Sequence, residues 1–277
     1  MLENFLRHAV ASVPAYADQV DNDPLSAFPV VDRAALSRGG SAFWSSAFAS
    51  DTLVVRTTSG TTGVPLRVPR DPASDYQFIY GTYRLAFDRI EELSEPQPDR
   101  CAVVQVNDNP LRHEQSLLHP ELGHAPMHHL VIGRAAAADH RTAQRIADER
   151  PQLIGGRPRG LLALADLAGR VGSPLRPQAL LSSGDNLHPA DRARLEAAFE
   201  APIYKAYASQ EGGLLALECP HRLGLVTFSH VRAESPPESR TVLTRFGHPE
   251  WVASSPPRPP TGRCPSSGTR LATRASW

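Results

Sequence analysis

Residues 180–211 read LLSSGDNLHPADRARLEAAFEAPIYKAYASQE and predict a strand, a helix and a second strand in that order. The short apolar run over 179–182 is typical of a buried strand. An amphipathic helix is expected over 189–200, and another apolar run over 203–207 predicts the second strand. Two parallel strands need a crossover connection, and a helix of this length supplies it.

The same alternation of short apolar runs with longer helical patterns extends toward the N-terminus. We expect further strands over 53–55, 66–68, 101–106 and 130–132, and further helices over 75–92, 139–149 and 161–171. Strands that alternate with helices favour an α/β fold with largely parallel sheets flanked by helices. Residues 107–128, which carry several histidines together with proline and glycine, are expected to form a loop.

The first 50 residues contain two simpler signals. Apolar residues recur at helical spacing over 1–20, and Pro14 is expected to break that helix. A short helix is expected over 32–37, where the side chain of Asp32 can cap the first turn.

The composition limits the classes of partner. The 277 residues carry 29 basic and 29 acidic side chains, and 41% of the residues are hydrophobic. This balance argues against a nucleic-acid partner, and no apolar run approaches the ~18 residues of a membrane span. The three cysteines are odd in number and lack metal-site spacing, which favours a reduced, cytoplasmic protein.

The charge is divided unevenly along the chain. Residues 236–277 carry six arginines against two glutamates, together with eight prolines. Such a stretch has little hydrophobic pattern and is expected to be disordered. We therefore divide the chain into a folded domain over 1–235 and a Pro/Arg-rich tail over 236–277.

A loop rich in hydroxyls follows the first predicted strand and reads TTSGTTGVP over residues 57–65. Its two glycines allow sharp backbone turns that present N–H groups, and its hydroxyls supply further donors. Together these groups suit a polyphosphate. The loop lacks the lysine of a P-loop, so it does not belong to that class of phosphate site.

The string T-S-G-T-T-G-x-P resembles the phosphate-binding loop of the adenylate-forming superfamily, which contains acyl-CoA synthetases and luciferases. The second signature of that superfamily is a small-Gly-acid segment, a helix and a strand that ends in Y-x-x-x-E. Here Ser183-Gly184-Asp185 and Tyr207-Ala208-Ser209-Gln210-Glu211 match it in order and spacing.

The resemblance implies ATP-dependent adenylation of a small carboxylic acid, followed by thioester formation on coenzyme A, with Mg²⁺ bound. Glu211 is implied as the Mg²⁺ ligand and, with Thr58, as a catalytic residue. The implied phosphate loop is Thr58, Ser59, Gly60, Thr61, Thr62 and Gly63. The implied walls of the adenine pocket are Ser183, Gly184 and Asp185 together with Tyr207, Ala208 and Ser209.

Within the superfamily, the sequence is most similar to phenylacetate–CoA ligase-like proteins, through V-P-A-Y over 13–16 and F-P-x-x-x-R-x-x-L over 28–36. The resemblance covers residues 1–233. Three positions depart from the pattern: Arg67 stands near the usual lysine, Asp185 replaces glutamate, and Gln210 replaces threonine or serine.

The resemblance also implies a later strand pair, an R-Y-x-T-G-D segment and a small domain with a catalytic lysine, and we find none of them. Lys205, the one lysine, precedes Y-x-x-x-E. Residues 261–277, read two bases later, permit a sequence that contains R-Y-E-T-G-D. We therefore expect the chain to be truncated and read out of frame from a point within 235–256 onward, with little ligase activity.

Other interpretations stay open at this stage. The chain could be a non-catalytic ATP-binding remnant or a pseudogene product, or a kinase-like phosphotransferase that lacks its usual catalytic set. The histidines over 113–129 could bind a metal, although we favour a role in lining a loop or pocket. Cys219 and His221 near Glu218 could likewise form part of a metal site.

Overall fold

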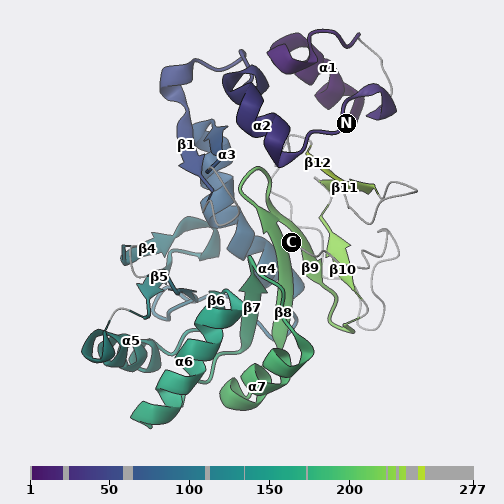
Figure 1. The fold of residues 1–277 in the computed structure, drawn as a ribbon. Helices are drawn as coiled ribbons and strands as arrows, with labels where there is room; N and C mark the ends of the chain where they lie inside the picture. Colours follow the sequence, from purple (N-terminus) through teal and green to yellow (C-terminus); the bar gives the residue numbers. More distant parts are fainter. Residues whose placement is uncertain are drawn as a thin grey trace.

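The computed structural model describes residues 2–20, 25–58, 65–109, 113–133, 135–172, 174–222, 224–228, 231–234 and 243–246. Its centre is an eight-stranded sheet in the order β10-β9-β8-β7-β6-β3-β5-β4 (Figure 1). Five neighbouring strands of this sheet are parallel: β8 (Ile203–Ser209), β7 (Ala179–Ser183), β6 (Leu153–Gly156), β3 (Val103–Asn107) and β5 (Ala125–Val131).

Helices cover both faces of the sheet. On one face α6 (Pro158–Val171) lies between α5 (Ala136–Glu149) and α7 (Pro189–Phe199), while α4 (Thr82–Arg89) packs on the other (Figure 1). A hydrophobic core lies on each face of the sheet, and β7 contributes to both, because Leu180 faces α5–α7 and Leu181 faces α4. This double burial explains the continuous apolar runs and confirms the predicted α/β class.

Antiparallel strands close both ends of the parallel block. Strand β4 (Gln115–His119) pairs with β5, and β9 (Gly213–Glu218) and β10 (Leu225–Thr227) extend the sheet beyond β8. The expectation that no strand pair follows Glu211 was therefore wrong. A further pair joins β11 (Val231–Glu234) to β12 (Leu243–Phe246). Strand β12 falls within 236–277, and the proposed domain boundary stays a prediction.

The prediction of a loop over 107–128 was also wrong for much of that range. Strands β4 and β5 occupy most of it, joined by a short turn, η6 (Pro120–Leu122), and by Gly123 at φ +62°. Pro126 lies inside β5, opposite Leu118 of β4. Proline cannot donate a ladder hydrogen bond, so its presence argued against a strand here. Strand β5 nevertheless forms because β3 and β4 pair with it on either side.

Residues N-terminal to the sheet form small helices and one hairpin. The helical elements are α1 (Leu2–Ser12), η1 (Pro14–Tyr16), η2 (Leu25–Ala27), α2 (Arg33–Gly39), η3 (Gly40–Phe43) and η4 (Ser50–Thr52). The hairpin pairs β1 (Val54–Thr57) with β2 (Arg67–Arg70). The predicted break at Pro14 and the cap at Asp32 are confirmed, since Asp32 Oδ1 accepts a 2.6 Å hydrogen bond from Ala35 N.

The helix expected over 75–92 is built from three joined pieces. Helix α3 (Pro72–Tyr76) begins after Asp71, whose carboxylate accepts bonds from the first turn, and leads into the π-helical segment η5 (Gln77–Gly81) and then α4. A π turn inside a helix is often found at functional sites. Among the helices that the structure describes, none is long and apolar enough to cross a membrane.

Candidate functional site

The carboxyl ends of the parallel strands bring the two predicted adenine-pocket segments together. Strands β7 and β8 pair in register, with Ser183 opposite Ala206, so residues 183–185 lie beside the end of β8 and residues 207–209. In open α/β sheets, ligands bind outside this edge. The two segments were predicted from motifs alone, and the sheet makes them neighbours.

Gly184 makes a turn that other residues adopt poorly. Its φ is +85°, and a Cβ at this position would lie 3.4 Å from the side chain of Arg157. Arg157 follows β6 and places its Nε 4.0 Å from the carboxylate of Asp185. Both side chains are well exposed, so this ion pair contributes little stability, and both remain accessible to a ligand.

Glu211 lies in the turn that joins β8 to β9. Ser209 Oγ accepts a 3.1 Å hydrogen bond from Gly212 N and so fixes the turn. Glu211 itself is exposed. Among the residues that the structure describes, none forms an ion pair or hydrogen bond with its carboxylate, which leaves two hard oxygen atoms for a cation such as Mg²⁺.

A buried arginine anchors this turn from a distant part of the chain. Arg70, at the end of β2, is 6% exposed and donates through Nη2 to the carbonyl oxygen of Gln210. The same nitrogen lies 3.3 Å from Gln210 Oε1, and the guanidinium stacks on the ring of Phe78 at 3.6 Å. Burial lowers the pKa of Arg70, while the nearby carboxylates of Asp75 and Glu211 oppose that effect.

Asp75 completes the network behind Arg70. Its carboxylate accepts bonds of 2.8 and 2.6 Å from Nε and Nη2 of Arg56, and Nη1 of Arg70 lies 3.3 Å away. The hydrogen bonds from Arg56 hold the pKa of Asp75 below its usual value, despite burial. One buried carboxylate thus holds two guanidinium groups, and the second of them positions the backbone beside Glu211.

The predicted phosphate loop begins close to this network. Thr58 Oγ1 accepts a 2.9 Å hydrogen bond from Leu66 N, and Thr58 N donates to Leu66 O at 3.0 Å. Thr58 therefore closes the base of the β1–β2 connection. The remaining predicted phosphate-loop residues, Ser59, Gly60, Thr61, Thr62 and Gly63, lie outside the described residues.

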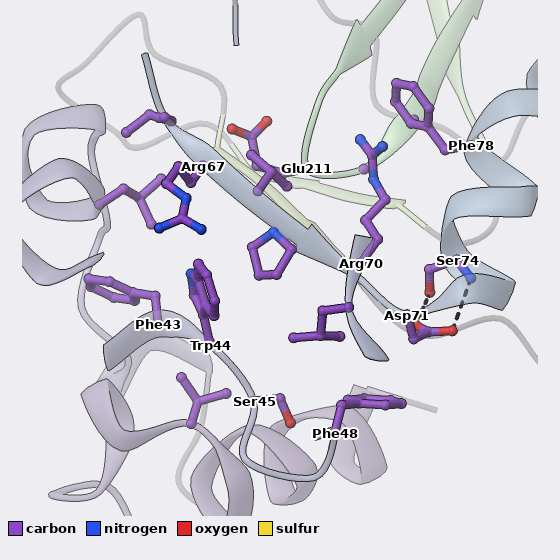
Figure 2. Close-up of a pocket in the computed structure, with 18 of the residues that line it drawn as sticks. Phe43, Trp44, Ser45, Phe48, Arg67, Arg70, Asp71, Ser74, Phe78 and Glu211 are labelled. Atoms are coloured by element: carbon purple, nitrogen blue, oxygen red, sulfur yellow. Dashed lines mark hydrogen bonds between the residues drawn. The ribbon is translucent and has the colours of Figure 1, made fainter. Parts of the chain in front are cut away.

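A cavity of about 1100 Å³ opens between β2, the segment from α3 to α4, the N-terminal helices and the start of β9. Figure 2 shows aromatic side chains of Phe43, Trp44 and Phe48 on the side of the N-terminal helices and Glu211 across from them. Arg67 lies 5.3 Å above the Trp44 ring. Neither residues 183–185 nor residues 207–209 line this cavity, so of the predicted residues described, only Glu211 does.

Sequence reasoning missed Arg70, Asp75 and the aromatic residues near 43–48. The contact between Arg70 and Gln210 joins residues 140 apart in the chain, and no motif links them. The aromatic group FWSSAF over 43–48 was a visible signal, because several aromatic residues in one short polar stretch are typical of a covered surface.

Glu218, which the sequence suggested as part of a metal site with Cys219 and His221, is already bound by other groups of the protein. Oε2 of Glu218 accepts a 2.6 Å bond from Arg192 Nη2 and a 3.0 Å bond from Lys205 N. This carboxylate therefore stabilises the β8–β9 pair.

Among the histidines, His119 is fully buried against Tyr80 and Tyr83, and its ring centroid lies 5.1 Å and 6.1 Å from theirs.

The fold is similar to that of 2-hydroxyisobutyryl-CoA ligase, solved in complex with 2-HIB-AMP and CoA. The open conformation of that ligase gives a TM-score of 0.63 at 18% identity, covering 84% of this chain and 58% of the ligase. Its thioesterification state gives 0.63 at 19% identity, covering 84% and 53%. Its postadenylation state with R3-HIB-AMP gives 0.63 at 17% identity, covering 85% and 54%.

These comparisons establish the fold and nothing finer. No protein-family model and no curated protein matches the sequence. The chain spans a little over half the length of the ligase. The predicted α/β architecture is confirmed.

Proposed function

We propose that the chain binds ATP and a small carboxylic acid and belongs to an acid–thiol ligase that forms an acyl-adenylate. In the first step a carboxylate oxygen attacks the α-phosphorus of ATP, and the bond to the bridging oxygen breaks to release pyrophosphate. In the second step a thiol such as coenzyme A attacks the acyl carbon and releases AMP. The phenylacetate-like specificity expected from the N-terminal motifs is part of the proposal.

One observation carries this function: the two motif segments and Glu211 meet at the carboxyl edge of β7 and β8. The adenine ring would lie between residues 183–185 and 207–209, and the phosphates would extend toward Thr58 and the loop after it. Mg²⁺ held by Glu211 would offset charge on the leaving pyrophosphate. The rest of the work is orientation, which the anchored turn beside Arg70 supports.

The cavity supports the acid-binding half of the proposal. Its mixed aromatic and charged lining suits a small acid with an apolar body, because apolar walls bury the body while a few polar groups fix its orientation. The proposed acid pocket therefore lies between the N-terminal helices and Glu211.

A direct test uses Glu211→Gln, with Glu91→Gln as the matched control because Glu91 is an exposed glutamate outside the site. We expect the wild-type chain to bind Mg-ATP, and Glu211→Gln to weaken that binding about tenfold or more by isothermal titration calorimetry, with Glu91→Gln unchanged. Failure of the folded wild-type chain to bind ATP would overturn the proposal.

The alternative function, ATP binding without turnover, is separated by pyrophosphate exchange. The 277 residues are expected to exchange weakly, because neither the R-Y-x-T-G-D segment nor the catalytic lysine that the resemblance implies is found among them. A gene with the frame restored after residue 235 should raise exchange strongly with the correct acid. Binding that never leads to exchange in the restored chain would favour the non-catalytic alternative.

A further inference from the structure

Three potential metal ligands converge far from Glu211. Cys101 lies two residues before the start of β3, His128 lies in β5, and Glu149 is the last residue of α5. Their ligand atoms, the sulfur, the imidazole nitrogen and a carboxylate oxygen, all lie within 4.8 Å of one another. Cys101 enters β3 at its amino end, whereas Glu211 follows the carboxyl end of β8, so the two sites lie at opposite edges of the sheet.

The imidazole of His128 has an unused nitrogen that faces this cluster. His128 is 7% exposed, and its Nε2 forms no hydrogen bond within the described structure. Nε2 lies 3.2 Å from Oε1 of Glu149, without the alignment that a hydrogen bond requires. Nitrogen and oxygen ligands of one tetrahedral zinc ion would stand about 3.3 Å apart, given metal–ligand distances of roughly 2.0–2.1 Å.

The other side of the ring faces a hydroxyl and a guanidinium group. Nδ1 of His128 lies 2.9 Å from Oγ of Ser116, on the paired strand β4. Arg145 Nη2 donates to the same hydroxyl at 2.8 Å and also lies 3.0 Å from Nδ1 of His128. Nδ1 can accept from Arg145 or donate its own hydrogen to Ser116. Zinc binding selects the second state, in which Nδ1–H donates to Ser116, Arg145 donates to the hydroxyl alone, and the lone pair of Nε2 points toward Cys101 and Glu149. Such outer hydrogen bonds fix the tautomer and orientation of metal-binding histidines.

We propose that Cys101 Sγ, His128 Nε2 and the Glu149 carboxylate bind one Zn²⁺ ion. A sulfur and an imidazole ligand favour zinc over the hard cation expected at Glu211. Binding deprotonates the thiol and releases its proton to solvent, and the resulting thiolate and carboxylate balance the charge of the ion. Three protein ligands leave one position for water, on the side where the Glu149 side chain is 31% exposed.

The ion would have to share Glu149 with one neighbour. Nε of Arg145 lies 3.8 Å from Glu149 Oε1, and the side chain of Arg145 is 39% exposed. This contact is long and partly solvated, so it competes weakly with a bound cation. By joining the segment before β3 to β5 and α5, the ion would tie the centre of the sheet to its covering helix.

Cobalt substitution tests the proposal with a readout that identifies sulfur. The reduced, chelator-treated full chain is titrated with Co²⁺, and we expect one equivalent to give the sulfur-to-cobalt charge-transfer band and the visible bands of a tetrahedral ion, both removed by Zn²⁺. Cys101→Ala should abolish the charge-transfer band. Ser116→Ala should weaken affinity about tenfold, as loss of an outer hydrogen bond does.

Two neighbouring substitutions serve as controls. His129→Gln and Asp148→Asn remove a histidine and a carboxylate one position away from the ligands and should leave the cobalt spectrum unchanged. Zn²⁺ should raise the thermal midpoint of the wild-type chain and of both controls, but not that of Cys101→Ala. Absence of the charge-transfer band in folded wild-type protein, or its persistence in folded Cys101→Ala, would overturn the site.

Discussion

Arg70 shows how one buried side chain can connect a predicted phosphate hairpin to a predicted metal ligand. Its guanidinium joins the β2 strand to the backbone of Gln210, one residue before Glu211, and Asp75 balances its charge. Removal of one partner of a buried charge pair is costly because the other charge is left without compensation. The position of the Glu211 turn should therefore depend on Arg70.

We predict that Arg70→Met lowers the free energy of unfolding by about 3–5 kcal/mol and weakens Mg-ATP binding about tenfold. Arg84→Met removes a comparable half-buried ion pair with Asp88 on α4, and should destabilise without altering ATP affinity. Urea unfolding and calorimetric titration give the two readouts. Equal loss of ATP affinity in both variants would show that Arg70 acts only through stability.

His119 should make the stability of the fold depend on pH. Burial lowers its pKa to about 4 from 6.5, with Glu121 opposing and Arg84 reinforcing the effect. Both ring nitrogens lack hydrogen-bond partners within the described structure. Because the folded state favours the neutral ring, its contribution is complete above pH 6.5 and is lost as the pH falls from 6.5 toward 4.

A shift of this size corresponds to about 3 kcal/mol of stability between pH 7 and pH 4. We predict that His119→Phe, which keeps an aromatic ring against Tyr80, flattens the pH profile of unfolding over that window. His124→Asn, at an exposed histidine with φ +60°, should leave the profile parallel to the wild type. Parallel profiles for all three proteins would contradict the assignment to His119.

Among the elements, α2 depends on one side chain for its first turn. The helix spans only Arg33–Gly39 and has no fully buried residue, so packing contributes little to it. Asp32 supplies a capping bond to Ala35 N at 2.6 Å. We predict that Asp32→Ala costs about 1 kcal/mol in the free energy of unfolding. Asp32→Asn keeps an oxygen acceptor and should recover most of that loss in the same urea titration.

The elements also show what local sequence can predict. The Asp32 cap and the break at Pro14 were predictable because their causes lie within a few residues. Strand β5 was largely missed because Pro126 interrupts its local pattern, while its stability comes from β3 and β4 on either side. Strand β9 was also missed, although its six buried residues form a continuous apolar run apart from the final Glu218.

For the whole molecule, the α/β class was predictable because short apolar runs alternate with helical patterns along the sequence. The arrangement of the residues around Glu211 was not predictable in this way. Motif order predicted that residues 183–185 and 207–211 act together, and the pairing of β7 with β8 makes them neighbours. No pattern could predict the contact between Arg70 and Gln210 or the convergence of Cys101, His128 and Glu149. These residues lie far apart in the chain, and only the sheet order brings them close.

The place of β3 in the sheet has a consequence for how the chain assembles. Strand β3 obtains β5 on one side and β6 on the other, after which β7, β8, β9 and β10 each add to the strand made just before. During synthesis the growing edge therefore always offers a template for the next strand to emerge. Once β6 has joined β3, this half of the sheet can form in the order of translation, which shortens the time that an apolar edge stays uncovered.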